Sequence, residues 1–275
     1  MRLDHVLVAV DFSPAWENLK QRLGYLKPWG VRKLTLVHVL STRYPAAPAE
    51  THRDAYTGDL KAAADALQQQ GFTVETELRT GEPGYELVQA AREHSADMIL
   101  AGARGHSRFH DFFLGSTALD LARLADRPVW LEPLDAEVVS DTTRILLATD
   151  GSEAAGGAER YFAALAPKAE RALALQAVVC SDPQDAECEE ADAKRHLADL
   201  VSRTAGIETR TDCGPAPQVI AERAAEGEFS LILVGKRGRT ALQELFLGST
   251  AEAVLRAGRR PVLLVPGDAL PPETA

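Results

Sequence analysis

The chain has 275 residues, of which 45% are hydrophobic, and this is enough for about two domains with ordinary cores. A formal net charge of −10 argues against non-specific binding to nucleic acid or anionic membranes, because clustered Lys and Arg hold those partners. No apolar stretch approaches the roughly 18 residues of a membrane span, and the first residues run into a strand instead of a secretory segment, so we expect a cytoplasmic protein.

The first half of the chain alternates between predicted strands and helices. It begins with an apolar run that ends in aspartate, as in strands buried on both faces of a parallel sheet, followed by Ser13 and Pro14, which suit a helix start. We expect strands at His5–Asp11, Lys33–Leu40, Phe72–Arg79, Asp97–Ala101 and Pro128–Leu131, and helices at Pro14–Lys27, Asp54–Gln70, Pro83–His94 and from Ser116 onward.

The second half repeats this alternation. Its first apolar run also ends in aspartate, and Ser152 is again placed to cap the next helix. We expect strands at Arg144–Asp150, Leu173–Cys180, Ile207–Cys213, Ser230–Val234 and Pro261–Val265, and helices at Glu153–Pro167, Ala186–Ala205, Pro215–Ala225 and from Ser249 onward.

The two halves also match residue by residue near their ends. Phe113–Ala118 recurs as Phe246–Ala251, with the same interval of 133 residues that separates Gly102 from Gly235. Strand–helix alternation with short loops predicts a parallel sheet with helices on both faces and right-handed crossovers. We therefore predict an α/β protein with two tandem doubly wound, five-stranded, Rossmann-like domains at residues 1–134 and 144–267, a linker at 135–143 and a tail at 268–275.

Each half carries one glycine motif, Gly-x2-Gly-x9-Gly-Ser-Thr, between its fourth strand and its last helix. Ligands of open α/β sheets bind beyond the carboxyl ends of the strands where the strand order reverses, so the motif should meet the aspartate that ends the first strand. Glycines let backbone amides approach an anion, and the amides of a helix start carry partial positive charge. Arg104 and Arg237 add local positive potential, so the pattern predicts two phosphate-binding loops.

Two simpler interpretations of these residues stay open. The glycines could serve only to turn the chain, and Asp11 and Asp150 could serve only to cap the helices that follow them. The motif is not a P-loop, because no Gly-x4-Gly-Lys-Ser/Thr is present, and neither first turn has the Gly-x-Gly-x-x-Gly of dinucleotide enzymes.

The repeated motif, paired with a first strand that ends Asp-Phe-Ser or Asp-Gly-Ser, resembles the universal stress protein family over nearly the whole chain, and the tandem arrangement resembles its two-domain members. The resemblance implies an adenine nucleotide alpha-hydrolase-like sheet and a role in stress response. The implied ligand is ATP, ADP or AMP, and Mg²⁺ or Mn²⁺ would be held through the phosphates.

The resemblance also implies which residues bind the nucleotide. In the nucleotide-binding branch of the family, the first-strand aspartate lies by the adenosine, an apolar residue late in the second strand meets adenine, and the glycine motif holds the phosphates. With the arginines and the helix-start threonines added, the candidate binding residues of the first half are Asp11, Val39, Gly102, Arg104, Gly105, Gly115, Ser116 and Thr117. Those of the second half are Asp150, Val178, Gly235, Arg237, Gly238, Gly248, Ser249 and Thr250.

Three classes of function compete for such a chain. We favour a regulatory protein that binds nucleotide without efficient catalysis, since one carboxylate per site is predictable and it belongs near the ribose, whereas rapid ATP hydrolysis needs a positioned base, a nucleophile or metal ligands. The alternatives are a slow Mg²⁺-dependent ATPase and a partner-interaction protein whose pocket binds no nucleotide. Either half or both could bind, and we favour both.

A small sheet of this kind leaves its fifth strand unpaired, and proteins cover such edges. Because single-domain members of the family pair fifth strands across a dimer axis, we expect Pro128–Leu131 and Pro261–Val265 to meet within the chain as a pseudo-dimer, and chains to form homodimers. The three cysteines, Cys180, Cys188 and Cys213, are odd in number and lack a Cys-x-x-Cys spacing, so we expect neither a disulfide framework nor structural zinc.

Overall fold

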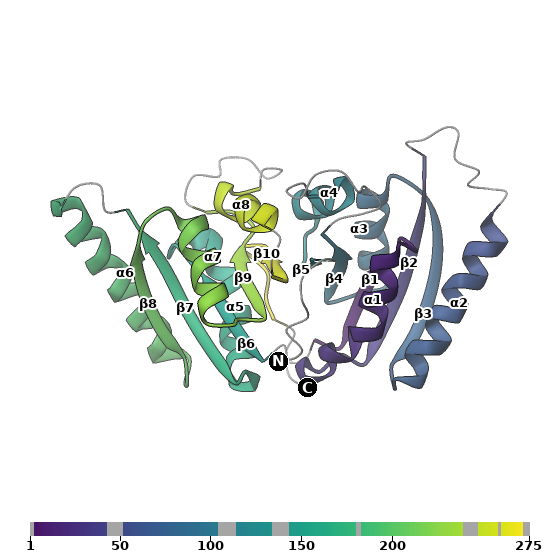
Figure 1. Ribbon diagram of the computed structural model, residues 1–275, viewed down its shortest axis with the longest axis horizontal. Helices are drawn as coiled ribbons and strands as arrows, with labels where there is room; N and C mark the ends of the chain where they lie inside the picture. Colours follow the sequence, from purple (N-terminus) through teal and green to yellow (C-terminus); the bar gives the residue numbers. More distant parts are fainter. Residues whose placement is uncertain are drawn as a thin grey trace. The chain divides into compact units, whose positions relative to one another are not determined.

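A computed structural model of the chain describes residues 3–42, 52–103, 114–133, 143–179, 183–238, 247–257 and 260–271. The chain divides into two compact units, Arg2–Asp135 and Ala136–Pro271, each an alternation of strands and helices (Figure 1). The elements of the first unit are β1 (His5–Ala9), α1 (Pro14–Arg22), the 3-10 helix η1 (Leu23–Trp29), β2 (Lys33–Ser41), α2 (Arg53–Gln69), β3 (Thr73–Gly81), α3 (Pro83–Glu93), β4 (Met98–Gly102), α4 (Ser116–Leu124) and β5 (Val129–Glu132).

The second unit repeats this order of elements. They are β6 (Arg144–Ala148), the 3-10 helix η2 (Glu153–Ala155), α5 (Gly156–Leu165), the 3-10 helix η3 (Ala166–Lys168), β7 (Arg171–Val178), α6 (Pro183–Arg203), β8 (Glu208–Cys213), α7 (Ala216–Glu226), β9 (Leu231–Gly235), α8 (Ser249–Ala257) and β10 (Val262–Val265). The predicted strands and helices are present, with bounds that differ by one to a few residues.

Within each unit the strands are parallel and their order reverses once. The order is β3-β2-β1-β4-β5 in the first unit and β8-β7-β6-β9-β10 in the second. Right-handed crossovers then place α1 and α2 on one face of the first sheet and α3 and α4 on the other, and α3 does pack against α4, as α7 packs against α8. The predicted doubly wound α/β architecture is confirmed, whereas the domain boundaries, the pairing of the fifth strands and the homodimer stay predictions.

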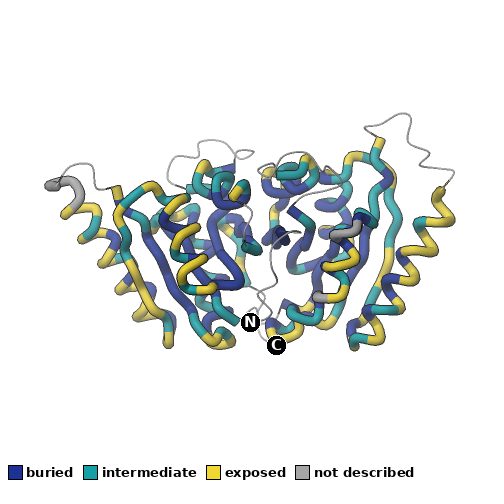
Figure 2. The backbone as a smooth tube through the Cα atoms, in the orientation of Figure 1, coloured by how far each residue is buried: buried dark blue, intermediate teal, exposed yellow. Residues whose placement is uncertain are grey.

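The central strands form the core of each unit. Val6, Leu7 and Val8 of β1 have no exposed surface, and Ile145, Leu146 and Leu147 of β6 have none either. The outermost strands β3 and β8 consist of exposed and half-buried positions instead (Figure 2). Exposure thus decreases from the outermost strands to the central strands. Loops can build a site at the carboxyl ends of the central strands. In the described part of the chain, no helix is long and apolar enough to cross a membrane.

Three details differ from the sequence expectations. The predicted helix Glu153–Pro167 is α-helical only over α5, with the 3-10 helices η2 and η3 at its two ends. The predicted helix Pro14–Lys27 is α-helical only to Arg22 and continues as the 3-10 helix η1, in which Pro28 lacks the N–H of a regular helix. Cys213 is disulfide-bonded and Cys188 is a free, exposed thiol; the sequence indicated no disulfide framework and did not predict this single bond. A single disulfide needs no regular spacing of cysteines along the chain.

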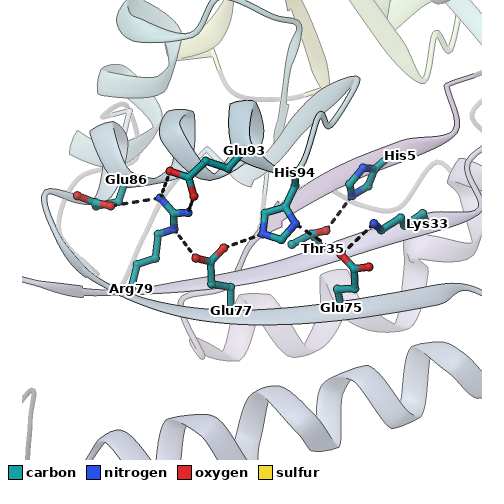
Figure 3. A network of polar contacts seen from close by, with 9 residues as sticks. All are labelled: His5, Lys33, Thr35, Glu75, Glu77, Arg79, Glu86, Glu93 and His94. Carbon is teal, nitrogen blue, oxygen red and sulfur yellow. Dashed lines mark hydrogen bonds and ion pairs between the residues drawn. The ribbon is translucent and has the colours of Figure 1, made fainter.

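A network of charged side chains joins β3 to α3 in the first unit (Figure 3). The Arg79 guanidinium donates to Glu77 at 2.8 Å and also pairs with Glu86 and Glu93 of α3. His94 Nε2 lies 2.8 Å from Glu77 Oε2, which extends the network along β3. The hydrogen bond from Arg79 lowers the pKa of Glu93, so folding favours the ionised form of this carboxyl group.

Arg79→Met is expected to lower the unfolding midpoint of the first unit by about 3–6 °C at pH 7, because three carboxylates lose their shared counter-charge. The pKa of Glu93 is lowered by folding, so its contribution is present above its ordinary value of 4.5 and is lost as the pH falls through the folded value. The difference between variant and parent should therefore shrink as the pH falls below 4.5. Thermal unfolding at pH 7 and pH 3.5 measures this, with Lys61→Met on the exposed face of α2 as the control. A midpoint difference independent of pH would contradict the electrostatic explanation.

Candidate functional site

In the second unit, the aspartate that follows β6 faces the glycine loop that follows β9. Asp150 Oδ1 accepts hydrogen bonds from the Ser152 N–H at 3.0 Å and from the Ser152 hydroxyl at 2.6 Å. Its Oδ2 lies beside Gly238, where an added β-carbon would be only 2.9 Å away. The strand-end aspartate and the glycine loop therefore meet where the strand order reverses, as the topology of an open α/β sheet predicts.

A cavity of about 190 Å³ opens at this place. Seven of the eight candidate residues of the second half line it: Asp150, Gly235, Arg237, Gly238, Gly248, Ser249 and Thr250. They come from the end of β6, the loop after β9 and the start of α8. Residues that are up to 100 positions apart in the sequence thus surround one space.

The glycines of this loop allow close approach of the backbone. A β-carbon on Gly235 would lie 3.0 Å from the Arg237 carbonyl oxygen and 3.1 Å from the Ala154 carbonyl oxygen. One on Gly248 would lie 3.4 Å from the backbone nitrogen of Gly238. The N–H of Gly248 also donates to the Lys236 carbonyl at 3.0 Å, which closes the loop onto the helix start. A β-carbon at Gly235 would therefore crowd the backbone of Ala154 and Arg237, and one at Gly248 would touch the loop backbone.

The start of α8 gives the cavity an electropositive wall. Ser249 is exposed, Thr250 is half-buried, and both line the cavity. The first amides of an α-helix have no partner inside the helix and carry about half a positive charge between them. Together with Arg237, this wall suits an anion.

The opposite part of the cavity is apolar. Its lining side chains come from β7 and α7 and include Leu175, Ala177, Ala216 and Ile220. Successive residues of a strand face opposite sides of the sheet, so Leu175 and Ala177 share a face that Val178 does not, and Val178 is not a lining residue. The sequence pointed to Val178, at the end of β7, and not to Leu175 or Ala177. The alternation of side chains along a strand could have indicated them, because it places residues 175 and 177 on the same face of the sheet.

The first unit has the same backbone arrangement at its own site. Asp11 Oδ1 accepts the Ser13 N–H at 3.0 Å, and the Gly115 N–H donates to the Ala103 carbonyl at 2.9 Å, matching Gly248 and Lys236. Gly102 ends β4, and Ser116 and Thr117 begin α4. Arg104 and Gly105 lie outside the described residues. Only the end of β4, the start of α4 and the turn at Asp11 are therefore described for this site.

The serines after the two aspartates cap the next helix. Ser13 Oγ accepts the Trp16 N–H at 3.2 Å and Ser152 Oγ accepts the Ala155 N–H at 3.3 Å. Each aspartate in turn accepts the N–H of its serine through Oδ1. The aspartates therefore hold the turn before the helix and are not themselves the capping residues.

An aromatic cluster lies next to the turn of the first unit. Phe12, whose φ is 55°, lies 4.9 Å from His38 and 5.7 Å from Tyr56 between ring centroids. His38 Nδ1 lies 2.7 Å from the Val10 carbonyl oxygen, so His38 is a packed, hydrogen-bonded residue. Val39, the candidate adenine contact, is half-buried at the end of β2.

No group of three or more His, Cys, Asp or Glu side chains that could hold a metal ion occurs among the residues that the structure describes. The cavity of the second unit offers Asp150 as a carboxylate, together with hydroxyls, backbone amides and a guanidinium. Such a set favours binding of an anion and supplies few groups for metal or acid–base chemistry.

Comparison with known proteins identifies the family of the chain. The model of the universal stress protein family matches residues 2–132 and 142–266. A universal stress protein of Mycolicibacterium smegmatis is 28% identical over 260 residues, covering 84% of this chain and 86% of the relative, and one of Mycobacterium tuberculosis is 28% identical over 258 residues with the same coverage.

Solved structures show the same fold. The crystal structure of a universal stress protein from Archaeoglobus fulgidus has a TM-score of 0.77, with 23% identity, over 97% of this chain and 98% of that one. A second structure, of a universal stress protein from Pseudomonas aeruginosa described as putative in its own report, has a TM-score of 0.69 at 18% identity over 97% of this chain and 94% of its own. Because the family model covers both halves, the chain belongs to the universal stress protein family and carries two of its domains in tandem.

Proposed function

We propose that both units bind ATP or a related adenine nucleotide, and that the chain acts as a stress-response regulator without efficient catalysis. The observation that carries the proposal is the convergence of Asp150, the glycine loop and the start of α8 on one cavity of the second unit. The matching turn and loop hydrogen bonds of the first unit extend the proposal to that half.

Each part of the cavity suits one part of the nucleotide. The amides of Ser249 and Thr250 and the Arg237 guanidinium suit the phosphates, which are anions at neutral pH. The Asp150 carboxylate suits the ribose hydroxyls, which donate hydrogen bonds. The apolar recess of Leu175, Ala177 and neighbouring side chains suits the base.

The lining also explains why we propose binding without rapid turnover. Among the described lining residues, Asp150 is the carboxylate, and it already accepts two hydrogen bonds from Ser152. A water molecule that attacks a phosphoryl group needs a positioned base, and this lining adds none next to α8. Mg²⁺ or Mn²⁺ would reach this site through the phosphates of the nucleotide.

Titration calorimetry of the full chain with ATP is expected to show about two sites per chain with dissociation constants in the micromolar range, about −8 kcal/mol each. ADP should bind similarly and tripolyphosphate more weakly, since it lacks the groups that the recess and Asp150 recognise. Absence of heat with ATP, ADP and AMP would contradict the proposal and favour a partner-interaction protein. Phosphate release faster than about 1 s⁻¹ per chain would instead favour the ATPase alternative.

The remaining family expectations belong to the same proposal. We propose that Pro128–Leu131 and Pro261–Val265 pair within the chain, as the fifth strands of single-domain relatives are expected to pair across a dimer axis. We also propose that the protein is cytoplasmic and that its chains form homodimers. Analytical ultracentrifugation with and without ATP measures the assembly, and a monomer at all concentrations would contradict the homodimer.

A further inference from the structure

A buried polar network lies directly behind Asp150 in the second unit. Its members come from four elements that converge there: Thr149 after β6, Glu159 of α5, Gln176 of β7 and His196 of α6. Thr149, Glu159 and Gln176 are each less than a tenth exposed. Buried polar groups are costly unless they are hydrogen-bonded, so a network of this size in a core needs an explanation.

The network holds both sides of one peptide unit. The Thr149 hydroxyl accepts the N–H of Gly151 at 3.1 Å and donates to Glu159 Oε1 at 2.6 Å. The Gln176 amide nitrogen lies 3.5 Å from the Asp150 carbonyl oxygen. The C=O of Asp150 and the N–H of Gly151 belong to the same planar peptide, so these contacts fix its orientation from two directions.

His196 joins the two arms of the network. Its Nε2 lies 2.9 Å from Glu159 Oε1, and its Nδ1 lies 3.1 Å from Gln176 Oε1. The Gln176 amide nitrogen must face the Asp150 carbonyl, which accepts hydrogen bonds, so its oxygen faces His196. Both ring nitrogens of His196 therefore face acceptors, and the ring links the Glu159 arm to the Gln176 arm.

Gly151 fits this arrangement. Its φ is +70°, and a β-carbon at this position would lie 3.2 Å from the His196 ring. The histidine therefore packs directly against the turn that carries Asp150. A residue with a side chain at position 151 would be strained and would displace the ring.

The first unit lacks this network at the corresponding turn. Val10 precedes Asp11 where Thr149 precedes Asp150, and it has no hydroxyl to offer. Phe12 follows Asp11 where Gly151 follows Asp150. The support behind the aspartate is thus a feature of the second unit and not of the repeated motif.

We propose that His196 and Glu159 are positioning residues of the second site: they hold the Asp150–Gly151 peptide so that the Asp150 carboxylate faces the cavity beside Gly238. This inference rests on the proposed nucleotide binding of that cavity. Its consequence is that the network sets the affinity for the nucleoside part of the ligand and leaves the phosphate contacts at α8 unaffected.

The test measures the affinities of the full chain for ATP and for inorganic tripolyphosphate by titration calorimetry. The second site is identified as the one that Gly248→Val removes. His196→Leu is expected to weaken ATP binding at that site about tenfold, as expected when hydrogen bonds to a charged group are lost. Tripolyphosphate affinity should be unchanged. Glu159→Gln, which keeps the shape of the side chain, should weaken ATP binding in the same direction by a smaller factor.

Two controls separate positioning from general damage. Arg195→Leu changes an exposed neighbour on α6 and should leave both affinities unchanged. In an Asp150→Ala background, His196→Leu should cause no further loss of ATP affinity, because the residue through which it acts is already absent.

The outcomes distinguish the inference from the function on which it rests. If the parent chain binds no ATP, the nucleotide site and its positioning residues are both overturned. If the parent binds ATP and His196→Leu binds it equally well, or if the losses from Asp150→Ala and His196→Leu add, only the positioning role is overturned. Equal loss of ATP and tripolyphosphate affinity would also overturn it, since that result indicates a merely structural role.

Discussion

Gly157→Ala is expected to destabilise the second unit by about 3 kcal/mol, whereas Gly156→Ala, one position earlier in α5, should leave its stability almost unchanged. A β-carbon on Gly157 would lie 1.8 Å from the Pro266 carbonyl oxygen and 2.9 Å from its carbonyl carbon. Both are backbone atoms at the end of β10, so relief requires α5 to move away from the sheet. The nearest neighbour of a β-carbon on Gly156 is the Arg160 guanidinium at 3.2 Å, and the end of a flexible side chain can move.

Urea unfolding followed by circular dichroism measures this difference, and the two units supply an internal reference. The transition assigned to the second unit should move to lower urea in Gly157→Ala, while that of the first unit stays in place. Alanine has the higher helix propensity, so Gly156→Ala is expected to be neutral or stabilising by less than about 1 kcal/mol. Equal effects of the two substitutions would show that the contact with Pro266 is not a constraint.

The close approach of Gly157 to the Pro266 carbonyl cannot be predicted from sequence patterns. The alternation of apolar runs with helix-compatible segments predicted both sheets, since runs such as His5–Asp11 follow from burial on two faces. The duplication predicted that the second unit would repeat the first. The approach of Gly157 to Pro266 depends on how α5 lies on β10, and nothing in the spacing of these residues along the chain records it.

The site, like the fold, was predictable from the sequence only in part. Topology alone brings a residue at the end of β6 to the loop after β9, and Asp150 does lie beside Gly238. The pleat of β7 decides that Ala177 and not Val178 lines the cavity, and this depends on the phase of the strand, which an apolar run does not reveal. His196 and Glu159 lie on two different helices, so their pairing needs the packed structure.

Gly248→Val is expected to abolish ATP binding at the second site, lowering the number of sites per chain from two to one. A β-carbon on Gly248 would already lie 3.4 Å from the Arg237 Cα and from the Gly238 nitrogen, and the two methyl groups of valine extend beyond it. They would force the loop away from the start of α8, so that the loop amides and the helix amides could no longer contact the same phosphates. Loss of about 3 kcal/mol or more corresponds to at least about a hundredfold weaker binding.

The repeat supplies the matched variants for this prediction. Gly115 makes the same loop hydrogen bond in the first unit, so Gly115→Val should remove the other site, and the double variant should bind no ATP. Gly58→Ala in α2, where a β-carbon would meet nothing within 4 Å, controls for the loss of a glycine elsewhere. Gly238→Val offers an independent route to the same loss, because its β-carbon would lie 2.9 Å from Asp150 Oδ2.

If the double variant is folded by circular dichroism and still binds two ATP molecules, the glycine loops do not hold the phosphates. One remaining site in the double variant would restrict that conclusion to one unit, since the two loops act on separate cavities.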